Sequence, residues 1–203
     1  LEAIKDNNGR GIAVIKPREN KKIIENIKKA ELSGALAVGI DIDGAGLVTM
    51  ALLGQPVGPK SKEDLIEIVK STTLPVILKG IMSVEEAQLA VEVGAKAIVV
   101  SNHGGRVLDD ALSSVDVLPE ITQAVKGKII IMADGSVRDG KDIFKYIALG
   151  ADYVLSARPL IWGAIGAGEE GVTKYINQMK NGLYQTMILT GANDIKSIDN
   201  KMI

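Results

Sequence analysis

Short apolar segments rich in valine and isoleucine alternate along this chain with longer segments that have the periodicity of amphipathic helices. Such short apolar runs are typical of strands that are buried on both faces of a sheet. The predicted strands are Gly11–Ile15, Ala37–Ile42, Pro75–Leu78, Ala97–Val100, Ile129–Met132 and Tyr153–Leu155. Helical patterns lie at about 19–33, 62–72, 84–93, 115–126 and 140–149, and a last helix runs from about 169 to 189. Alternating strands and helices predict an α/β fold with a parallel sheet.

The ends of the helical segments carry local signals that support these assignments. Ser61 with Asp64, and Ser83 with Glu86, have the spacing of capping boxes at helix starts. A glycine in the left-handed conformation is expected where a helix ends before a Gly-Ala pair, at Gly34, Gly94 and Gly150. One face of the last helix carries a stripe that we interpret as core packing, made of Val172, Ile176, Met179, Leu183 and Met187.

The number of strands limits the choice of architecture. A complete (β/α)8 barrel usually takes about 250 residues, and this chain has 203 residues and six predicted strands. That length suffices for one sizeable core, so we expect a single domain over residues 1–203. On periodicity alone, a barrel that lacks two βα units and a doubly wound sheet both remain open.

Composition excludes several classes of protein. The 24 basic and 25 acidic residues nearly cancel, and no basic stripe points to nucleic acid. No apolar run approaches the roughly 20 residues that cross a bilayer, so no membrane partner is expected. The chain has no cysteine, which excludes disulfides and thiolate sites and favours a cytoplasmic location. Because the sequence begins at Leu1 rather than at methionine, we expect a fragment of a longer protein.

The only histidine of the chain, His103, directly follows a predicted strand. It lies in the segment SNHGGR, three residues before Arg106. Chemistry in parallel α/β folds takes place at the carboxyl ends of strands, and histidine is the side chain that titrates nearest neutrality. A structural polar loop is the alternative interpretation, but the flanking glycines and the arginine favour catalysis.

Polar and ionisable side chains follow five consecutive predicted strands at the same end. These groups are Asp41 and Asp43, Lys79, Ser101 and His103, Asp134 and Arg138, and finally Arg158. The glycine of Asp134-Gly135 and the two arginines predict an anion cradle at the last two strands, where barrels usually bind phosphate. Lys79 is interpreted either as a Schiff-base nucleophile or as a point charge beside a cofactor anion.

The order and spacing of these motifs resemble a known enzyme family. From about Leu74 to Ile198 the chain is similar to the FMN-dependent α-hydroxy-acid oxidases and dehydrogenases, which include glycolate oxidase, lactate oxidase and lactate dehydrogenases. The segments that carry the resemblance are LPVILKGIMSVEEAQLAVEVGAKAIVVSNHGGRVLD, ADGSVRDGKDIFKYIALGADYVLSARP and GEEGVTKYINQMKNGLYQTMILTGANDIKSI. The resemblance implies a TIM barrel that lacks its first two βα units in this chain and binds FMN at its carboxyl-terminal face.

The resemblance also implies a role for each site residue. His103 would be the catalytic base, Asp43 would orient it, and Arg106 would bind the carboxylate of a small substrate. Lys79 would stabilise negative charge on the reduced flavin. The flavin, ribityl chain and phosphate would contact the remaining residues, namely Ser101, Asp134, Gly135, Arg138, Ala157 and Arg158. No metal is implied, and the family tends toward homo-oligomers.

Several positions depart from the family pattern near the substrate. The first strand reads Ala13-Val14-Ile15-Lys16-Pro17, where the family usually has a tyrosine. Asp41 stands where a neutral threonine is usual, and Ala157 replaces a glycine. The segment from Asp43 to Lys79 is shorter than in the family and lacks a second substrate-binding arginine.

Three functional hypotheses follow from the sequence. The first is FMN-dependent oxidation of a small L-2-hydroxy acid, such as lactate or glycolate, to the 2-oxo acid. The second is a related FMN barrel that isomerises its substrate, as the type 2 isopentenyl diphosphate isomerase does, although the His103 and Arg106 pair argues against it. The third is a non-catalytic barrel fragment that binds flavin or phosphate.

Overall fold

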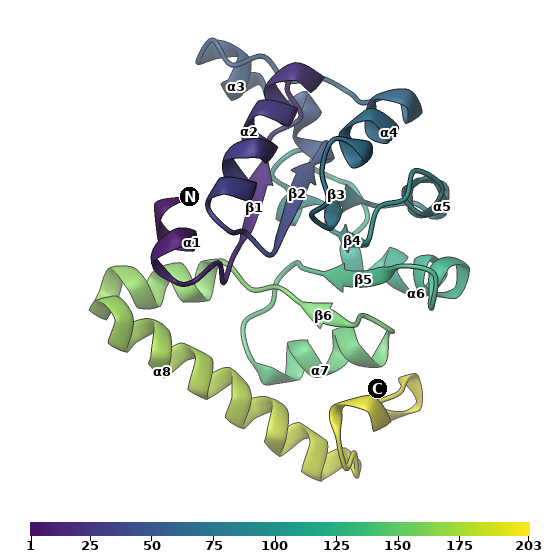
Figure 1. Ribbon diagram of the computed structural model, residues 1–203. Helices are drawn as coiled ribbons and strands as arrows, with labels where there is room; N and C mark the ends of the chain where they lie inside the picture. The colour runs from purple at the N-terminus through teal and green to yellow at the C-terminus, as the bar shows by residue number, and fades with distance from the viewer.

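Six parallel strands in sequential order form one curved sheet, as the sequence predicts (Figure 1). The computed structural model describes residues 1–203. The strands are β1 (Ile12–Ile15), β2 (Ala37–Asp41), β3 (Val76–Ile81), β4 (Ala97–Val100), β5 (Ile130–Ala133) and β6 (Tyr153–Val154). Each pairs only with its neighbours in sequence, and β1 and β6 each pair on one side only. The sheet is therefore an open part of a barrel.

Helices follow the strands around the outside of this sheet (Figure 1). They are α1 (Glu2–Asp6), α2 (Asn20–Leu32), α3 (Val48–Leu52), α4 (Lys62–Lys70), α5 (Val84–Glu92), α6 (Ser114–Val125), α7 (Gly140–Ala148) and α8 (Arg158–Thr190). Short 3-10 turns are η1 (Ile42–Gly46), η2 (His103–Gly105), η3 (Ile195–Ser197) and η4 (Asn200–Met202). No helix combines the length and the apolar character that a membrane crossing requires.

The predicted helix signals are confirmed. Both capping boxes form, with the Ser61 hydroxyl accepting from the Asp64 N–H and the Ser83 hydroxyl accepting from the Glu86 N–H. The three predicted terminal glycines all have positive φ, at +73° for Gly34, +85° for Gly94 and +105° for Gly150. Local chemistry thus fixes where most of the helices begin and end.

The last helix has one segment more than predicted. α8 begins at Arg158 and breaks at Ala167 and Gly168, where the dihedral angles are not helical, so its second segment begins near 169 as predicted. The first segment is rich in glycine and shows no clear helical periodicity, so it was not predicted as a helix. Pro159 is nevertheless well suited to a first helical turn. The predicted apolar stripe packs only in part: Met179 is buried and Leu183 and Met187 pack beside α7, but Ile176 is 44% exposed.

The two faces of the sheet are buried to very different extents. Alternate strand residues on the outer face join helix residues in one core of 28 buried side chains. On the concave face only Ala37, Ile77, Ala97 and Val99 form a small buried cluster. Elsewhere on that face Val14 and Tyr153 are 57% and 59% exposed. The stability of the chain therefore comes from the helix-covered face.

This asymmetry predicts different costs for the same substitution at adjacent positions of β5. Ile131 faces the helices and is 0% exposed, whereas Ile130 faces the concave side and is 42% exposed. Ile131→Ala should lower the free energy of unfolding by about 2–5 kcal/mol. Ile130→Ala should cost less than half as much, measured by urea unfolding of the 203-residue chain. Equal costs would mean that the concave face is covered in solution.

Candidate active site

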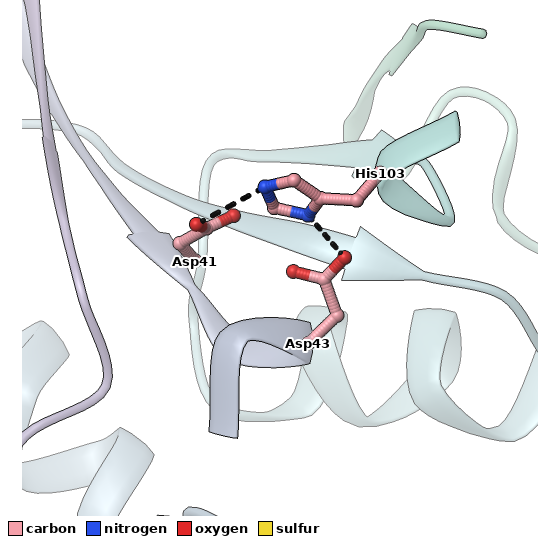
Figure 2. A group of neighbouring side chains, drawn as sticks. All are labelled: Asp41, Asp43 and His103. Atoms are coloured by element: carbon pink, nitrogen blue, oxygen red, sulfur yellow. Dashed lines mark hydrogen bonds and ion pairs between the residues drawn. The ribbon is translucent and has the colours of Figure 1, made fainter. Parts of the chain in front are cut away.

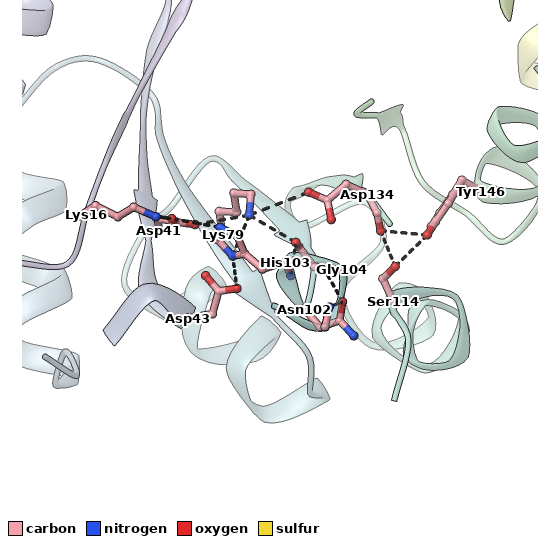
Figure 3. A network of polar contacts seen from close by, with 12 residues as sticks. Lys16, Asp41, Asp43, Lys79, Asn102, His103, Gly104, Ser114, Asp134 and Tyr146 are labelled. Atoms are coloured by element: carbon pink, nitrogen blue, oxygen red, sulfur yellow. Dashed lines mark hydrogen bonds and ion pairs between the residues drawn. The ribbon is translucent and has the colours of Figure 1, made fainter. Parts of the chain in front are cut away.

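The carboxyl ends of the parallel strands bring the ionisable groups of the sequence to one edge of the sheet. The strand register places Asp41 of β2 directly beside Lys79 of β3. Lys16 follows β1, Ser101 and His103 follow β4, and Asp134 follows β5. Figure 3 shows a polar network that joins side chains from these strand ends, among them Lys16, Asp41, Lys79, His103 and Asp134. The prediction that groups far apart in sequence meet at this edge is confirmed.

His103 lies between two carboxylates (Figure 2). Its Nδ1 is 2.6 Å from Oδ2 of Asp43, and its Nε2 is 3.5 Å from Oδ2 of Asp41. Because an ionised carboxylate only accepts hydrogen bonds, the contact with Asp43 assigns a proton to Nδ1. The lone pair of the neutral ring is then on Nε2, as a general base requires.

The backbone around His103 is built to present the ring. His103 itself has a φ of +55°, and its N–H donates to the Ser101 hydroxyl at 3.2 Å. The Asn102 side chain accepts from the N–H groups of Gly104 and Gly105, at 2.9 and 3.2 Å. A non-glycine residue with positive φ is uncommon and is often found at functional sites. The turn holds the imidazole over the strand ends.

Asp41 is the most deeply buried ionisable group of the network, with 2% of its surface exposed. Burial alone raises the pKa of this carboxyl. The hydrogen bond from Lys16 and the nearby charge of Lys79 outweigh burial, so the pKa of Asp41 lies below its ordinary value. Asp41 is therefore ionised near neutrality. Lys16 and Lys79 both contact Asp41, and Asp43 contacts His103, so we assign no metal ligand here.

Lys79 connects the histidine to the rest of the site. Its Nζ lies 3.4 Å from Oδ1 of Asp41, 3.3 Å from the Ser101 hydroxyl and 3.9 Å from Oδ2 of Asp134. The same Nζ is 3.4 Å from Nδ1 of His103. Its side chain is 16% exposed. This partial burial among carboxylates fits a fixed point charge, and nothing in its surroundings marks it as a Schiff-base nucleophile.

A cavity of about 510 Å³ opens beside this network. Every predicted site residue except Asp43 and Ser101 lines it: Lys79, His103, Arg106, Asp134, Gly135, Arg138, Ala157 and Arg158. Asp43 and Ser101 lie behind the histidine and line a separate apolar pocket of about 400 Å³. A larger hollow between α7 and α8 has polar walls such as Asn177 and Gln185 and none of the strand-end groups. The strand-end cavity is therefore the candidate site.

Three arginines at this cavity make no ion pair with any carboxylate of the chain. They are Arg106, Arg138 and Arg158. Arg138 donates to the backbone oxygen of Val137 at 3.2 Å, and its guanidinium lies 5.4 Å from the ring centroid of Trp162. Guanidinium groups left without carboxylates beside a cavity are suited to bind an anion.

The loop after β5 offers backbone donors to the same anion. The N–H groups of Gly135, Ser136 and Val137 make no hydrogen bond within the chain. Behind the loop, the Ser114 hydroxyl donates to the Asp134 carbonyl, and the Tyr146 hydroxyl is 2.9 Å from the carbonyls of both Asp134 and Gly135. Burial raises the pKa of Tyr146, so its hydroxyl stays protonated as a donor. The carbonyls of Asp134 and Gly135 are thus held by side chains behind the loop, and the N–H groups of Gly135 to Val137 have no partner within the chain.

Sequence reasoning missed four contributors to this site. Ser114 directly precedes one predicted helix and Tyr146 lies inside another, where nothing distinguished them from structural residues. Trp162 lies in the unpredicted first segment of α8, and its one signal is that it is the only tryptophan. Lys16 was identified only as a departure from the family pattern, and the structure places it against Asp41.

Comparison with known proteins places the chain among flavin enzymes. Residues 49–203 match the FMN-dependent dehydrogenase family. Human 2-hydroxyacid oxidase 2 is 44% identical over 140 residues, which cover 69% of this chain and 40% of that protein. The L-lactate oxidase of Nostoc sp. is 44% identical over 160 residues, which cover 78% of this chain and 43% of that protein. The chain thus spans less than half the length of these curated relatives.

Solved structures agree with the sequence comparison. A crystal structure of mandelate oxidase superposes with a TM-score of 0.90 at 31% identity. The match covers 97% of this chain and 64% of that one. The open sheet seen here therefore corresponds to a large part of a complete barrel.

Gly80 provides a test of how the Asp43–His103 pair is held. Gly80 lies at a bulge in β3 with a φ of +101°, and a Cβ atom at this position would overlap the Asp43 carboxyl group. Gly80→Ala should displace Asp43 and break its contact with Nδ1 of His103, so the deshielded Nδ1 proton signal that this contact predicts should be absent from the proton NMR spectrum.

The matched control is Gly94→Ala. Gly94 also has a positive φ, of +85°, but its Cβ would meet only Val69 at 3.7 Å. Both variants should lose about 1 kcal/mol of stability from the backbone conformation. An unchanged Nδ1 signal in Gly80→Ala would show that Asp43 does not depend on this glycine.

Proposed function

The chain belongs to the FMN-dependent dehydrogenase family, and from this we propose that it carries the catalytic half of an FMN-dependent 2-hydroxy-acid oxidoreductase. Residues 1–203 would form a single partial barrel domain. The substrate would be a small L-2-hydroxy acid, such as lactate or glycolate, oxidised to the 2-oxo acid. The observation that carries the proposal is the 2.6 Å contact between His103 and Asp43 at the edge of a cavity with three unpaired arginines.

The residues at the cavity fit FMN. Arg138 and Arg158, with the free N–H groups of Gly135 to Val137, would hold the phosphate. Asp134 and Ala157 would contact the ribityl chain and the ring. Ser101 is fully buried and does not line this cavity, so it would act through its contact with Lys79. Lys79 would stabilise negative charge on the reduced ring, since its ammonium is fixed and partly buried. When bound, FMN supplies an acceptor for the electron pair that leaves C2 of the substrate.

The chain's own residues would handle the proton and the carboxylate. Nε2 of His103 would accept the proton of the substrate hydroxyl, while Asp43 keeps Nδ1 protonated and orients the ring. The resulting imidazolium would be stabilised by Asp43. Arg106 lines the cavity without a carboxylate partner and would bind the substrate carboxylate, which fixes C2 and its hydroxyl relative to the base.

The names of the relatives support this substrate class and differ on its finer identity. They include a 2-hydroxyacid oxidase, an L-lactate oxidase and a mandelate oxidase. Activity as an L-lactate dehydrogenase or oxidase is the narrower form of the proposal. Homo-oligomeric assembly and a cytoplasmic location stay predictions from the sequence.

The most direct test of the reaction is the visible absorption spectrum of the chain with FMN, before and after L-lactate under anaerobic conditions. The proposal predicts bound flavin bands that bleach with lactate, and much slower bleaching in His103→Ala with the flavin still bound. Loss of the base should lower the rate by about 100-fold or more. Bound flavin that no 2-hydroxy acid bleaches would favour the non-catalytic alternative, which the exposed concave face supports.

A second prediction concerns the phosphate. Arg158→Met should weaken FMN binding by about 10- to 100-fold, because a hydrogen-bonded charge is worth about 1.5–3 kcal/mol. The affinity for riboflavin, which has no phosphate, should change little. Arg10→Met, on the exposed surface before β1, serves as the control and should bind both flavins as the original chain does. Equal losses for FMN and riboflavin would place Arg158 away from the phosphate.

A further inference from the structure

Lys16 directly follows β1, at a position whose side chain faces the concave side of the sheet. Ile12 and Val14 point to the concave face, and Lys16 continues that alternation at the carboxyl end of the strand. Its ammonium group forms an ion pair with Oδ2 of Asp41. The lysine side chain is 33% exposed, whereas the Asp41 side chain is 3% exposed. The pair therefore joins a buried carboxylate to a cation at the rim of the site (Figure 3).

The oxygen of Asp41 that contacts Lys16 also faces the histidine. Oδ2 of Asp41 lies 3.5 Å from Nε2 of His103, and this nitrogen must accept the substrate proton under the proposed function. The other side of the ring contacts Asp43. His103 thus has a carboxylate at each ring nitrogen. Asp43 alone would suffice to orient the ring, so Asp41 is an additional negative charge.

Two carboxylates around one imidazole favour its protonated form. An opposite charge within 4–6 Å stabilises the charged state of a titratable group, commonly by one pKa unit or more. An imidazolium has no lone pair and cannot act as a base. Some positive charge must therefore offset Asp41 if His103 is to accept a proton near neutrality.

The charged groups around the ring show which cation does this. Asp41 of β2, Asp43 of η1 and Lys79 of β3 contact the ring itself. The ammonium group of Lys79 also contacts Asp134, which follows β5, and the Ser101 hydroxyl. Arg106 makes no ion pair within the chain. Lys16 alone contacts the same Asp41 oxygen that faces Nε2.

We propose that Lys16 is a positioning residue that neutralises Asp41 and so keeps Nε2 of His103 unprotonated and able to accept the substrate proton. The lysine and the aspartate act as a unit, since Asp41 alone would favour a protonated His103 and Lys16 alone would disfavour it. The inference rests on the proposed role of His103 as base, but the protonation of the ring can be measured without substrate or turnover.

The single histidine of the chain makes the measurement unambiguous. Nitrogen-15 NMR of the imidazole across the pH range reports both its tautomer and the midpoint of its titration. Lys16→Gln keeps a donor for Asp41 but removes the charge, and it should move the midpoint upward by about one unit. Asp41→Asn should move the midpoint downward. The double variant Lys16→Gln/Asp41→Asn should lie close to the original chain.

Two further variants separate charge from structure. Lys16→Arg keeps the charge and should retain the original midpoint. Lys22→Gln removes a lysine that pairs with Glu25 on the outer surface of α2, and it should leave the midpoint unchanged. If Lys16→Gln gives the same midpoint as the original chain, or if Lys16→Arg shifts it as much as Lys16→Gln does, the proposal is wrong.

Kinetics distinguish this inference from the proposed function. Suppose that a 2-hydroxy acid bleaches the bound flavin. Lys16→Gln should then move the acidic limb of the pH profile of kcat/KM to higher pH, by as much as the NMR midpoint moves, and turnover should recover at higher pH. If no 2-hydroxy acid reduces the flavin but the NMR midpoints move as described, the proposed substrate fails while the control of His103 by Lys16 stands.

Discussion

Parallel pairing of six consecutive strands is the constraint on which both the core and the site depend. It places every strand's carboxyl end at one edge, so Asp41, Lys79, His103 and Asp134 meet although up to 93 residues, from 41 to 134, separate them. The same pairing turns alternate side chains toward the helices, where they form the core. Stability and chemistry thus come from different parts of the same strands: the outer face is packed, and the ends carry the ionisable groups.

Charge is distributed unevenly along that edge. Around His103 the charges balance one another in pairs, because Lys16 and Lys79 both contact Asp41, and Asp43 contacts His103 itself. On the far side of the cavity Arg138 and Arg158 have no carboxylate partner, and the N–H groups after Asp134 are free. A balanced region suits a base that must change its protonation state, whereas an unbalanced one suits a bound phosphate. The geometry therefore supports a cofactor anchored at one end and a proton transfer at the other.

Much of this arrangement could be predicted from sequence because it depends on local signals. Capping boxes, glycines after helices and apolar runs located the helices and strands, and the motifs after the strands located the site. The rest depends on contacts between distant residues. No local pattern shows that Lys16 meets Asp41, or that Tyr146 supports the turn at Gly135. The helical segment of α8 before the break at Gly168 and the exposure of Ile176 likewise could not be seen in the periodicity.

A crystal structure of the chain grown with FMN tests the central claim most directly, namely that one edge of the sheet holds both the cofactor and the base. The phosphate is expected between Arg138, Arg158 and the N–H groups of Gly135 to Val137, with the flavin ring extending toward Lys79 and His103. A phosphate bound elsewhere, or a ring that points away from His103, would contradict the proposed site.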